Sequence, residues 1–301
     1  MEGNQECGRK MVSQALLTKQ GICLLWACLC LVSSVWADEN TFWRYAGGRP
    51  DFIGGRRCAL SAKEELKYLN RKGYDLCYSP RLKACVWIAY ALTPNDVTNQ
   101  LGRIGCFKQD DDLLKEVLRP DAYGGSGYDR GHMAPSQDMQ YTEEVSRQSF
   151  WMGNIMPQLP LLNRGEWKRL EGKIHRKVVP NDHGEVESRR VYVMAGPVFT
   201  RDAIRQYERD ARMLKGTGEG KEPILKPERY WKIFKYGIMV DAVIMDQNGN
   251  AQSVMVEEIS QLTGLRFFQR MQDDLRAFYL RFRRPVYGNP YENEEKENDD
   301  E

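Results

Sequence analysis

The stretch Tyr128-Asp129-Arg130-Gly131-His132-Met133-Ala134-Pro135 decides how the rest of this 301-residue chain is interpreted. It places one of only three histidines beside an aspartate, an arginine and a glycine in a polar turn. Imidazole, with an ordinary pKa of about 6.5, suits a base near neutral pH. Because a lone histidine is more often packed or solvated than catalytic, the surrounding sequence has to supply further chemistry.

Two ordered polar motifs lie a short way downstream of this turn. Asn154 begins the run Asn-Ile-Met-Pro-Gln, and Asn163 begins a run in which Trp167 and Glu171 follow at intervals of four. With the first turn they match, in order, Asp-Arg-Gly-His, Asn-x-x-Pro-Gln and Asn-x-x-x-Trp-x-x-x-Glu. The chain thereby resembles the DNA/RNA non-specific endonucleases, the ββα-metal or His-Me finger nucleases that include endonuclease G and secreted bacterial nucleases.

The resemblance extends from about Leu66 to about Phe268, because Gly196-Pro197-Val198-Phe199 and Leu262-Thr263-Gly264-Leu265 are similar to later framework segments of the family. It implies an α+β fold of the ββα-metal type, with a mixed, largely antiparallel sheet flanked by helices. The residue pattern favours the same class, since strand-like and helix-like segments mix without regular βαβ order.

Hydrophobic patterning places the expected elements along the chain. Strand patterns cover 74–78, 85–92, 191–199, 236–245 and 254–259, and helix patterns cover 63–70, 142–152, 167–178 and 201–214. A glycine-rich loop, 120–127, leads into the histidine turn. Asn163 then lies just before one helix and Glu171 about two turns further on, so both can address one site.

The resemblance gives three residues the central roles. His132 is the general base that deprotonates water, Asn163 is the direct protein ligand of a divalent metal, and Glu171 holds waters around the ion. A neutral amide oxygen suits Mg²⁺, with Mn²⁺ as the alternative, because Mg²⁺ prefers oxygen ligands and keeps several waters. A helix cap is a second role for Asn163, compatible with the first.

Four further residues complete the candidate site. Asn154 is expected to position the phosphate or the base, with an ordinary turn asparagine as the alternative. Arg130 is a candidate substrate contact, because a guanidinium matches phosphate oxygens. Asp129, also assigned to substrate binding, is expected to orient that turn. Arg103 lies near where the family carries an arginine that stabilises the pentavalent transition state, although its local match is loose and a surface arginine is the alternative.

Composition excludes a disordered or fibrous chain, since 42% of the residues are hydrophobic. The net charge of +2 conceals an acidic tail: Glu292–Glu301 holds seven acidic residues and one lysine, and residues 38–291 hold 40 basic against 33 acidic residues. A body of +7 suits a polyanion such as nucleic acid. We expect the tail, 286–301, to be disordered.

The N-terminal 37 residues are predicted to be a signal peptide. Basic residues precede an apolar run at 21–32, and cleavage is expected after Ala37. The alternatives are a retained signal anchor and, less well matched, a lipoprotein site at Cys28 or Cys30. An irregular segment, 38–62, then precedes the nuclease domain, 63–285.

Four cysteines follow the predicted signal peptide, and an even number in an exported chain favours two disulfides. We expect Cys77 to pair with Cys85 and Cys58 with Cys106, with reduced buried thiols as the alternative. No cysteine and histidine spacing predicts a zinc site.

Together with the predicted signal peptide, the resemblance implies a secreted, Mg²⁺-dependent, sugar-non-specific endonuclease that hydrolyses DNA and RNA to 5′-phosphate products. The alternatives are a non-catalytic nucleic-acid-binding protein on the same fold, a mitochondrial endonuclease G-like nuclease, which should carry an Arg-rich amphipathic leader, and a membrane-tethered nuclease. A protein inhibitor and a homodimer stay open as partners, since no residue pattern identifies either.

Overall fold

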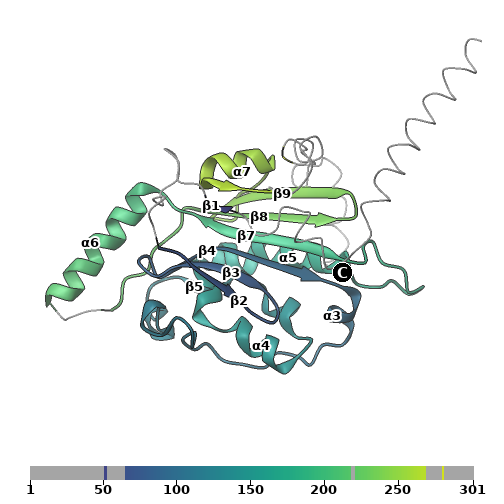
Figure 1. The fold of residues 1–301 in the computed structure, drawn as a ribbon, viewed down its shortest axis with the longest axis horizontal. Helices are drawn as coiled ribbons and strands as arrows, with labels where there is room; N and C mark the ends of the chain where they lie inside the picture. The colour runs from purple at the N-terminus through teal and green to yellow at the C-terminus, as the bar shows by residue number, and fades with distance from the viewer. Residues whose placement is uncertain (1–50, 53–64, 218–220, 269–279, 281–301) are drawn as a thin grey trace, which may run out of the picture.

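The computed structural model describes residues 51–52, 65–217, 221–268 and 280. A seven-stranded sheet in the order β10-β9-β8-β7-β4-β3-β2 lies at the centre of this part of the chain (Figure 1). Every neighbouring pair in it is antiparallel. Its strands are β2 (Lys67–Asn70), β3 (Asp75–Ser79), β4 (Ala84–Leu92), β7 (Val191–Val198), β8 (Arg229–Tyr236), β9 (Met239–Asp246) and β10 (Ala251–Ser253).

Two short strand pairs accompany the central sheet. β5 (Asp129–His132) pairs with β6 (Ile155–Gln158), and β1 (Asp51–Phe52) pairs with β11 (Leu265–Arg266), both antiparallel. Strands and helices are therefore combined as the α+β prediction requires. The predicted signal peptide, 1–37, and acidic tail, 286–301, lie outside the described residues.

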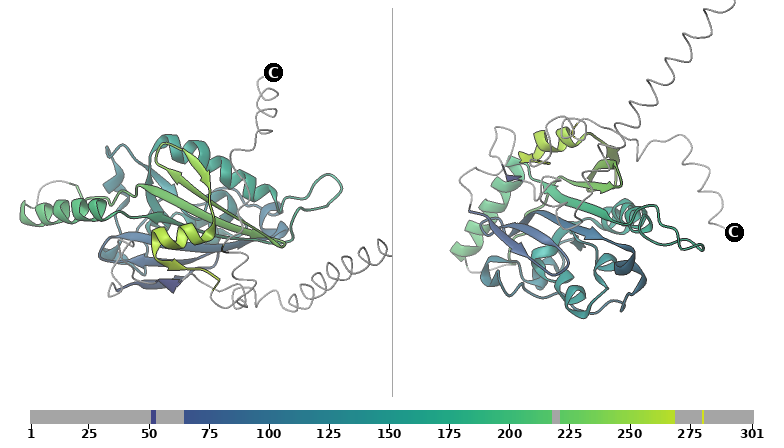
Figure 2. Two further views of the ribbon diagram at one scale, coloured as in Figure 1. Left: turned by 90° about the horizontal axis from the view of Figure 1, so that it is seen from above. Right: turned by 45° about the vertical axis from the view of Figure 1, so that its right-hand side comes forward.

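The helices are α3 (Pro94–Thr98), α4 (Glu143–Ser149), α5 (Trp167–Arg176), α6 (Arg201–Thr217) and α7 (Val256–Thr263). Figures 1 and 2 show α6 extending away from the body of the molecule. No helix within the described ranges is long and apolar enough to cross a membrane.

The two faces of β8 show how the sheet is covered. On one face the ring of Tyr230 packs against Trp167 of α5, with centroids 5.6 Å apart. On the other, Trp231 packs edge-on against Phe267 at 5.4 Å, as the alternation of side chains along a strand requires. Gly196 of β7 makes room for Trp231, because a Cβ at Gly196 would lie 2.6 Å from the indole. The rings thus fix α5 against one side of the sheet.

Most of the expected elements are confirmed, and three differ. The helix predicted at 63–70 is wrong where it is described: Lys67–Asn70 form the edge strand β2, because pairing with β3 satisfies their backbone. The strand predicted at 254–259 is wrong as well, since α7 begins at Val256 and the Glu258 carboxylate accepts the N–H of Met255 at 2.8 Å. The strand predicted at 236–245 overlaps β9 but includes only the last residue of β8, because lysines interrupt the apolar pattern of β8.

The predicted disulfide between Cys77 and Cys85 is wrong. Both thiols are free and buried, and the register pairs Cys77 with Trp87 and Tyr78 with Cys85, so the two cysteines are not cross-strand partners. Cys106 is free and exposed, and its predicted partner, Cys58, lies outside the described residues.

Candidate active site

The candidate site is built on a ββα unit formed by β5, β6 and α5. The register pairs Asp129 with Gln158 and His132 with Ile155. Between them, Gly131 is required by space, because a Cβ there would lie 2.3 Å from the Gln158 Oε1 atom. A kinked segment, Leu162–Glu166, carries the chain from β6 into α5, and Gly165 within it takes non-helical angles of φ −101° and ψ −117°.

The imidazole of His132 lies between two phenylalanine rings. The ring of Phe150 meets it edge-on with centroids 5.0 Å apart, and that of Phe107 lies at 5.5 Å. His132 Nε2 is buried, with no hydrogen-bond partner among the described residues. Burial, and then the positive charge of Arg103, lower the pKa of His132 to about 3. The imidazole is therefore neutral at neutral pH and can accept a proton.

Two exposed guanidinium groups flank this histidine. That of Arg103 lies 4.6 Å from the centroid of Phe150, and that of Arg130 lies 4.3 Å from the centroid of Phe107. Neither forms an ion pair with a carboxylate in the part of the chain that the structure describes. The aromatic faces that hold His132 thus also position two cations that can meet phosphate oxygens.

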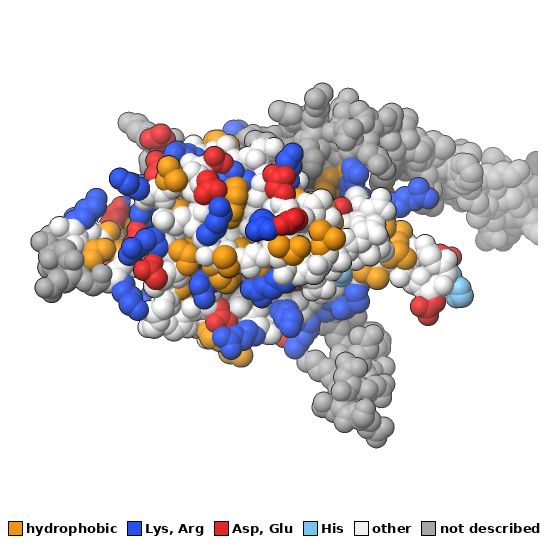
Figure 3. Space-filling view, turned by 90° about the horizontal axis from the view of Figure 1, so that it is seen from below, with side chains coloured by type: hydrophobic (Ala, Val, Ile, Leu, Met, Phe, Trp, Pro, Cys, Tyr) orange, Lys and Arg blue, Asp and Glu red, His pale blue; other side chains and the backbone are white. Residues whose placement is uncertain are grey.

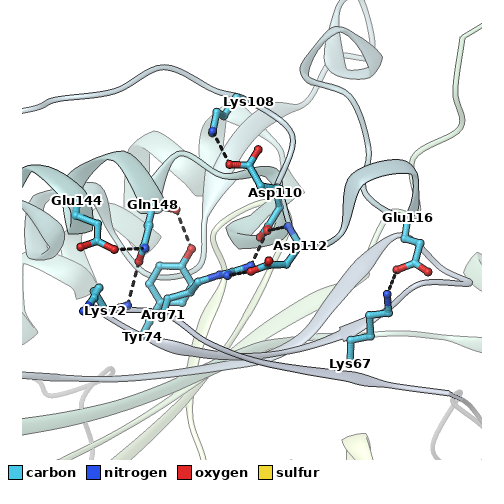
Figure 4. Close-up of polar contacts among 11 residues, drawn as sticks. Lys67, Arg71, Lys72, Tyr74, Lys108, Asp110, Asp112, Glu116, Glu144 and Gln148 are labelled. Carbon is cyan, nitrogen blue, oxygen red and sulfur yellow. Dashed lines mark hydrogen bonds and ion pairs between the residues drawn. The ribbon is translucent and has the colours of Figure 1, made fainter.

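Charged side chains and main-chain hydrogen bonds fix the segment that carries Phe107, and Figure 4 shows the contacts of Arg71 with Asp110 and Asp112. Arg71 donates to Asp110 at 2.5 Å and also pairs with Asp112. Next to it, the main chain of Lys108 accepts the N–H of Met152 at 2.9 Å and donates to the carbonyl of Phe150 at 3.3 Å. The segment that carries Phe107 is thereby fixed against the segment that carries Phe150.

Asp129 holds the residue expected to bind metal. Its carboxylate accepts from Asn163 Nδ2 at 2.9 Å and from two nitrogens of Arg164 at 2.8 Å each. These hydrogen bonds, above all that from Arg164, lower the pKa of Asp129. Because a carboxylate only accepts, the amide nitrogen of Asn163 must face Asp129, and its Oδ1 is left for a cation. Asp129 therefore acts as an orienting residue.

The donor set fits a mostly hydrated ion. Among the described residues there is no group of three or more His, Cys, Asp or Glu side chains that could hold a metal. An amide oxygen oriented by a neighbouring carboxylate suits Mg²⁺, which binds few protein ligands and keeps its waters.

Glu171 is paired with a buried lysine of the central sheet. Lys232 Nζ lies 3.1 Å from Glu171 Oε1 and 4.1 Å from the ring centroid of Trp167. The indole of Trp167 donates to the carbonyl of His132 at 3.4 Å. Burial raises the pKa of Glu171 to about 7, while Lys232 opposes the rise and Asp138 adds to it. Lys232 thus contacts both α5 residues of the motif.

Asn154 does not have the arrangement expected of a residue that contacts the phosphate. The residue is fully buried. Its amide accepts from the N–H of Ala134 at 2.8 Å and donates to the carbonyls of Ala134 and Ser149 at 2.9 and 2.8 Å. No part of the amide is left to contact a phosphate, so Asn154 positions the turn that follows His132.

Several residues of the site were missed by the sequence analysis. Lys232 had a signal, because a lysine in the apolar run Tyr-Trp-Lys-Ile-Phe is unusual unless it has a partner. Phe107 and Phe150 had none, since each is remote in sequence from His132. Arg164 directly follows Asn163, and nothing in the sequence tied it to Asp129.

A neutral, half-buried imidazole, two guanidinium groups without ion pairs in the described part of the chain and an oriented amide oxygen can act together in metal-assisted phosphoryl transfer. Residues 56–274 match the model of the DNA/RNA non-specific endonucleases, and the chain belongs to this family.

Individual relatives agree with this assignment. The chain is 29% identical to bovine (Bos taurus) mitochondrial endonuclease G over 191 residues, which cover 62% of this chain and 59% of the relative. It is 30% identical to a nuclease of Serratia marcescens over 227 residues, covering 69% of this chain and 77% of the relative. The chain thus spans less than two thirds of the bovine protein.

A solved structure shares the fold. The EndoG chain of an EndoG/EndoGI complex, described as showing the mechanism of EndoG inhibition, superposes with a TM-score of 0.55 at 20% identity. The match covers 78% of this chain and 94% of that chain.

Proposed function

We propose that this protein is a Mg²⁺-dependent, sugar-non-specific endonuclease that hydrolyses DNA and RNA and leaves 5′-phosphate ends. The observation that carries the proposal is the neutral imidazole of His132, placed between two unpaired arginines on the ββα unit of a chain that belongs to this family.

His132 is the general base in this proposal. Its Nε2 is enclosed, so Nδ1 is the ring nitrogen that takes a proton from the attacking water. A pKa of about 3 keeps the base neutral over the working range of pH. Arg103 and Arg130 meet the phosphate oxygens on which charge builds up during the reaction.

Asn163 holds the metal through its Oδ1, and Asp129 fixes the orientation of that amide. A bound Mg²⁺ supplies positive charge at the phosphate and the leaving oxygen. Glu171 in its deprotonated form would hold waters of a bound ion, and Lys232 favours that form. Asn154 positions the turn after the base.

The lack of sugar preference follows from the contacts that these residues can make. Arg103 and Arg130 offer guanidinium groups, which recognise phosphate and carry no base or sugar information. The face shown in Figure 3 carries many Lys and Arg side chains with Asp and Glu among them, and the net excess of basic residues in 38–291 favours binding to a polyanion.

Export is a further part of the proposal. It is supported by the apolar run and the cleavage pattern of residues 1–37, followed by a nuclease domain at 63–285. Mass spectrometry of the protein recovered from its native host would show an N-terminus at Asp38, whereas an intact leader would contradict export by cleavage.

The test is cleavage of plasmid DNA and of RNA by the purified protein with Mg²⁺ or with EDTA. His132→Ala should lower kcat by about 10²- to 10⁴-fold on both substrates, and Asn163→Ala should raise the Mg²⁺ concentration needed. The exposed His183 gives a matched control, since His183→Ala should cleave like the wild type. Ligation of the products without prior kinase treatment would confirm 5′-phosphates. Salt-sensitive binding with no cleavage would instead establish a non-catalytic binding protein.

A further inference from the structure

A recess of about 450 Å³ lies beside the strand that carries His132. Its walls come from the glycine-rich loop at 122–126, from α6 and from the segment 221–226. Gly124, Gln206, Tyr207, Lys221 and Lys226 are among its lining residues. The volume lies within the range of small-molecule and nucleotide sites.

The recess is continuous with the catalytic strand. Gly125 and Gly127 take φ values of +72° and +80°, which let the loop turn directly into β5. Side chains two residues apart share a face of a strand, so Arg130 and His132 of β5 lie on one face, and Tyr128 directly precedes the strand. Four residues at about 3.3 Å each put Tyr128 roughly 13 Å from His132.

Lys226 links the recess to the start of β5. Its ammonium lies 5.3 Å from the ring centroid of Tyr128, and the side chain is exposed. In the described part of the chain Lys226 forms no ion pair. The acidic lining residue Glu222 is paired with Lys83 instead. A second acidic lining residue, Asp210, accepts a hydrogen bond from Gln206 at 2.7 Å.

These groups favour a nucleotide as the occupant. The Lys226 ammonium, beside the half-buried ring of Tyr128, suits a phosphate with its adjoining base, since aromatic rings combined with cationic contacts are how proteins hold single strands. Inside the recess, amide and carboxylate groups of α6 can meet the polar edge of a base. The acidic groups there disfavour a second phosphate, so the phosphate belongs at the mouth.

We propose that this recess binds one nucleotide of the substrate strand, with its phosphate on Lys226 and its base in the recess. At roughly 13 Å from His132, the recess lies beyond the nucleotides that directly flank the scissile phosphate. The inference rests on the proposed nuclease function and adds that affinity depends on substrate length.

The experiment compares Lys226→Ala and Gln206→Trp with the wild type on DNA oligonucleotides of 3 and 12 nucleotides. The first variant removes the cation, and the second fills the recess from an exposed helix position without changing charge. Lys72→Ala is the matched control, because Lys72 is an exposed lysine in the β2–β3 turn and lies away from the recess. The turn at the other end of β3 holds Lys83, which pairs with the lining residue Glu222.

With Mg²⁺ present, Lys226→Ala should raise KM for the 12-mer by about threefold to tenfold and leave kcat unchanged. Gln206→Trp should raise it as well, whereas KM for the 3-mer should stay constant. Binding of the 12-mer in a His132→Ala background should show a salt dependence reduced by about one counterion for Lys226→Ala.

Equal KM values for both variants, the wild type and Lys72→Ala on the 12-mer would overturn the recess while leaving the nuclease intact. Loss of cleavage by the wild type itself would instead refute the proposed function. The binding measurement in the His132→Ala background still tests the recess in that case, because it does not depend on turnover.

Discussion

Replacing Lys232 by methionine should make the stability of the protein depend on pH in a defined way. The substitution removes the ammonium 3.1 Å from Glu171 Oε1 and leaves a carboxyl whose side chain is only 16% exposed. Methionine keeps most of the lysine volume, so packing against Trp167 is retained.

The magnitude follows from the protonation of Glu171. Its pKa is about 7 in the folded protein against an ordinary value of 4.5, so the folded state binds this proton more tightly than the unfolded state. The resulting stabilisation is complete below about pH 4.5 and is lost as the pH rises to about 7. Lys232 lowers the pKa of Glu171, so this pKa is higher in the variant. The stabilisation from the bound proton is then lost over a range that extends above pH 7. At about 1.36 kcal/mol per pH unit, the penalty should grow between pH 7 and 8.5 by at most about 2 kcal/mol.

Urea denaturation at pH 6, 7 and 8.5 measures this penalty. Lys235→Met, at a second buried lysine of β8, is the comparison at pH 6 and 7 only, because burial lowers the pKa of Lys235 to about 8 and its own titration enters at pH 8.5. The double variant Lys232→Met with Glu171→Gln should remove the added dependence, because no carboxyl is left to titrate. The acid limb of the activity profile should also move to higher pH, since we propose that the ionised Glu171 is required.

A penalty for Lys232→Met that stays constant from pH 6 to 8.5 would refute the reasoning. It would mean that the lysine does not set the charge of Glu171 and that its role is confined to packing against Trp167.

Three further substitutions test the architecture of the site. Gly131→Ala should cost about 1–3 kcal/mol by forcing the new methyl group into Gln158, and pairing it with Gln158→Ala in thermal unfolding should restore most of the loss. Asn154→Ala removes three buried hydrogen bonds to the main chain. The free energy of unfolding should therefore fall by about 3 kcal/mol, and kcat should fall with it. An unchanged kcat would disprove a positioning role. Asp129→Asn should raise the Mg²⁺ concentration for half-maximal cleavage by about tenfold or more, because Asn163 loses its orienting carboxylate. An unaltered Mg²⁺ titration would contradict the orienting role of Asp129.

Long apolar segments could be predicted from the sequence. β4, β7 and α5 were expected close to their observed positions, since their patterns repeat over eight or more residues. Short elements were not, as Lys67–Asn70 show: four residues carry too little pattern, and their pairing with β3 decided for a strand.

The candidate site was likewise predicted only in part from the sequence. The order and spacing of the motif singled out His132, Asn163 and Glu171, because those intervals follow from one strand, one turn and one helix. The motif could not show that the Asn154 amide is fully occupied by main-chain groups, since its partners are set by how two turns meet.

The sequence by itself therefore determined the family, the fold class and the residues proposed to act on the phosphate, because these depend on local spacing. Only the tertiary structure decided the protonation of those residues. The rings around His132 and the lysine beside Glu171 come from segments remote in sequence, Phe107, Phe150 and Lys232. Burial and charge act through space, so packing sets the pKa of the base and of the carboxylate.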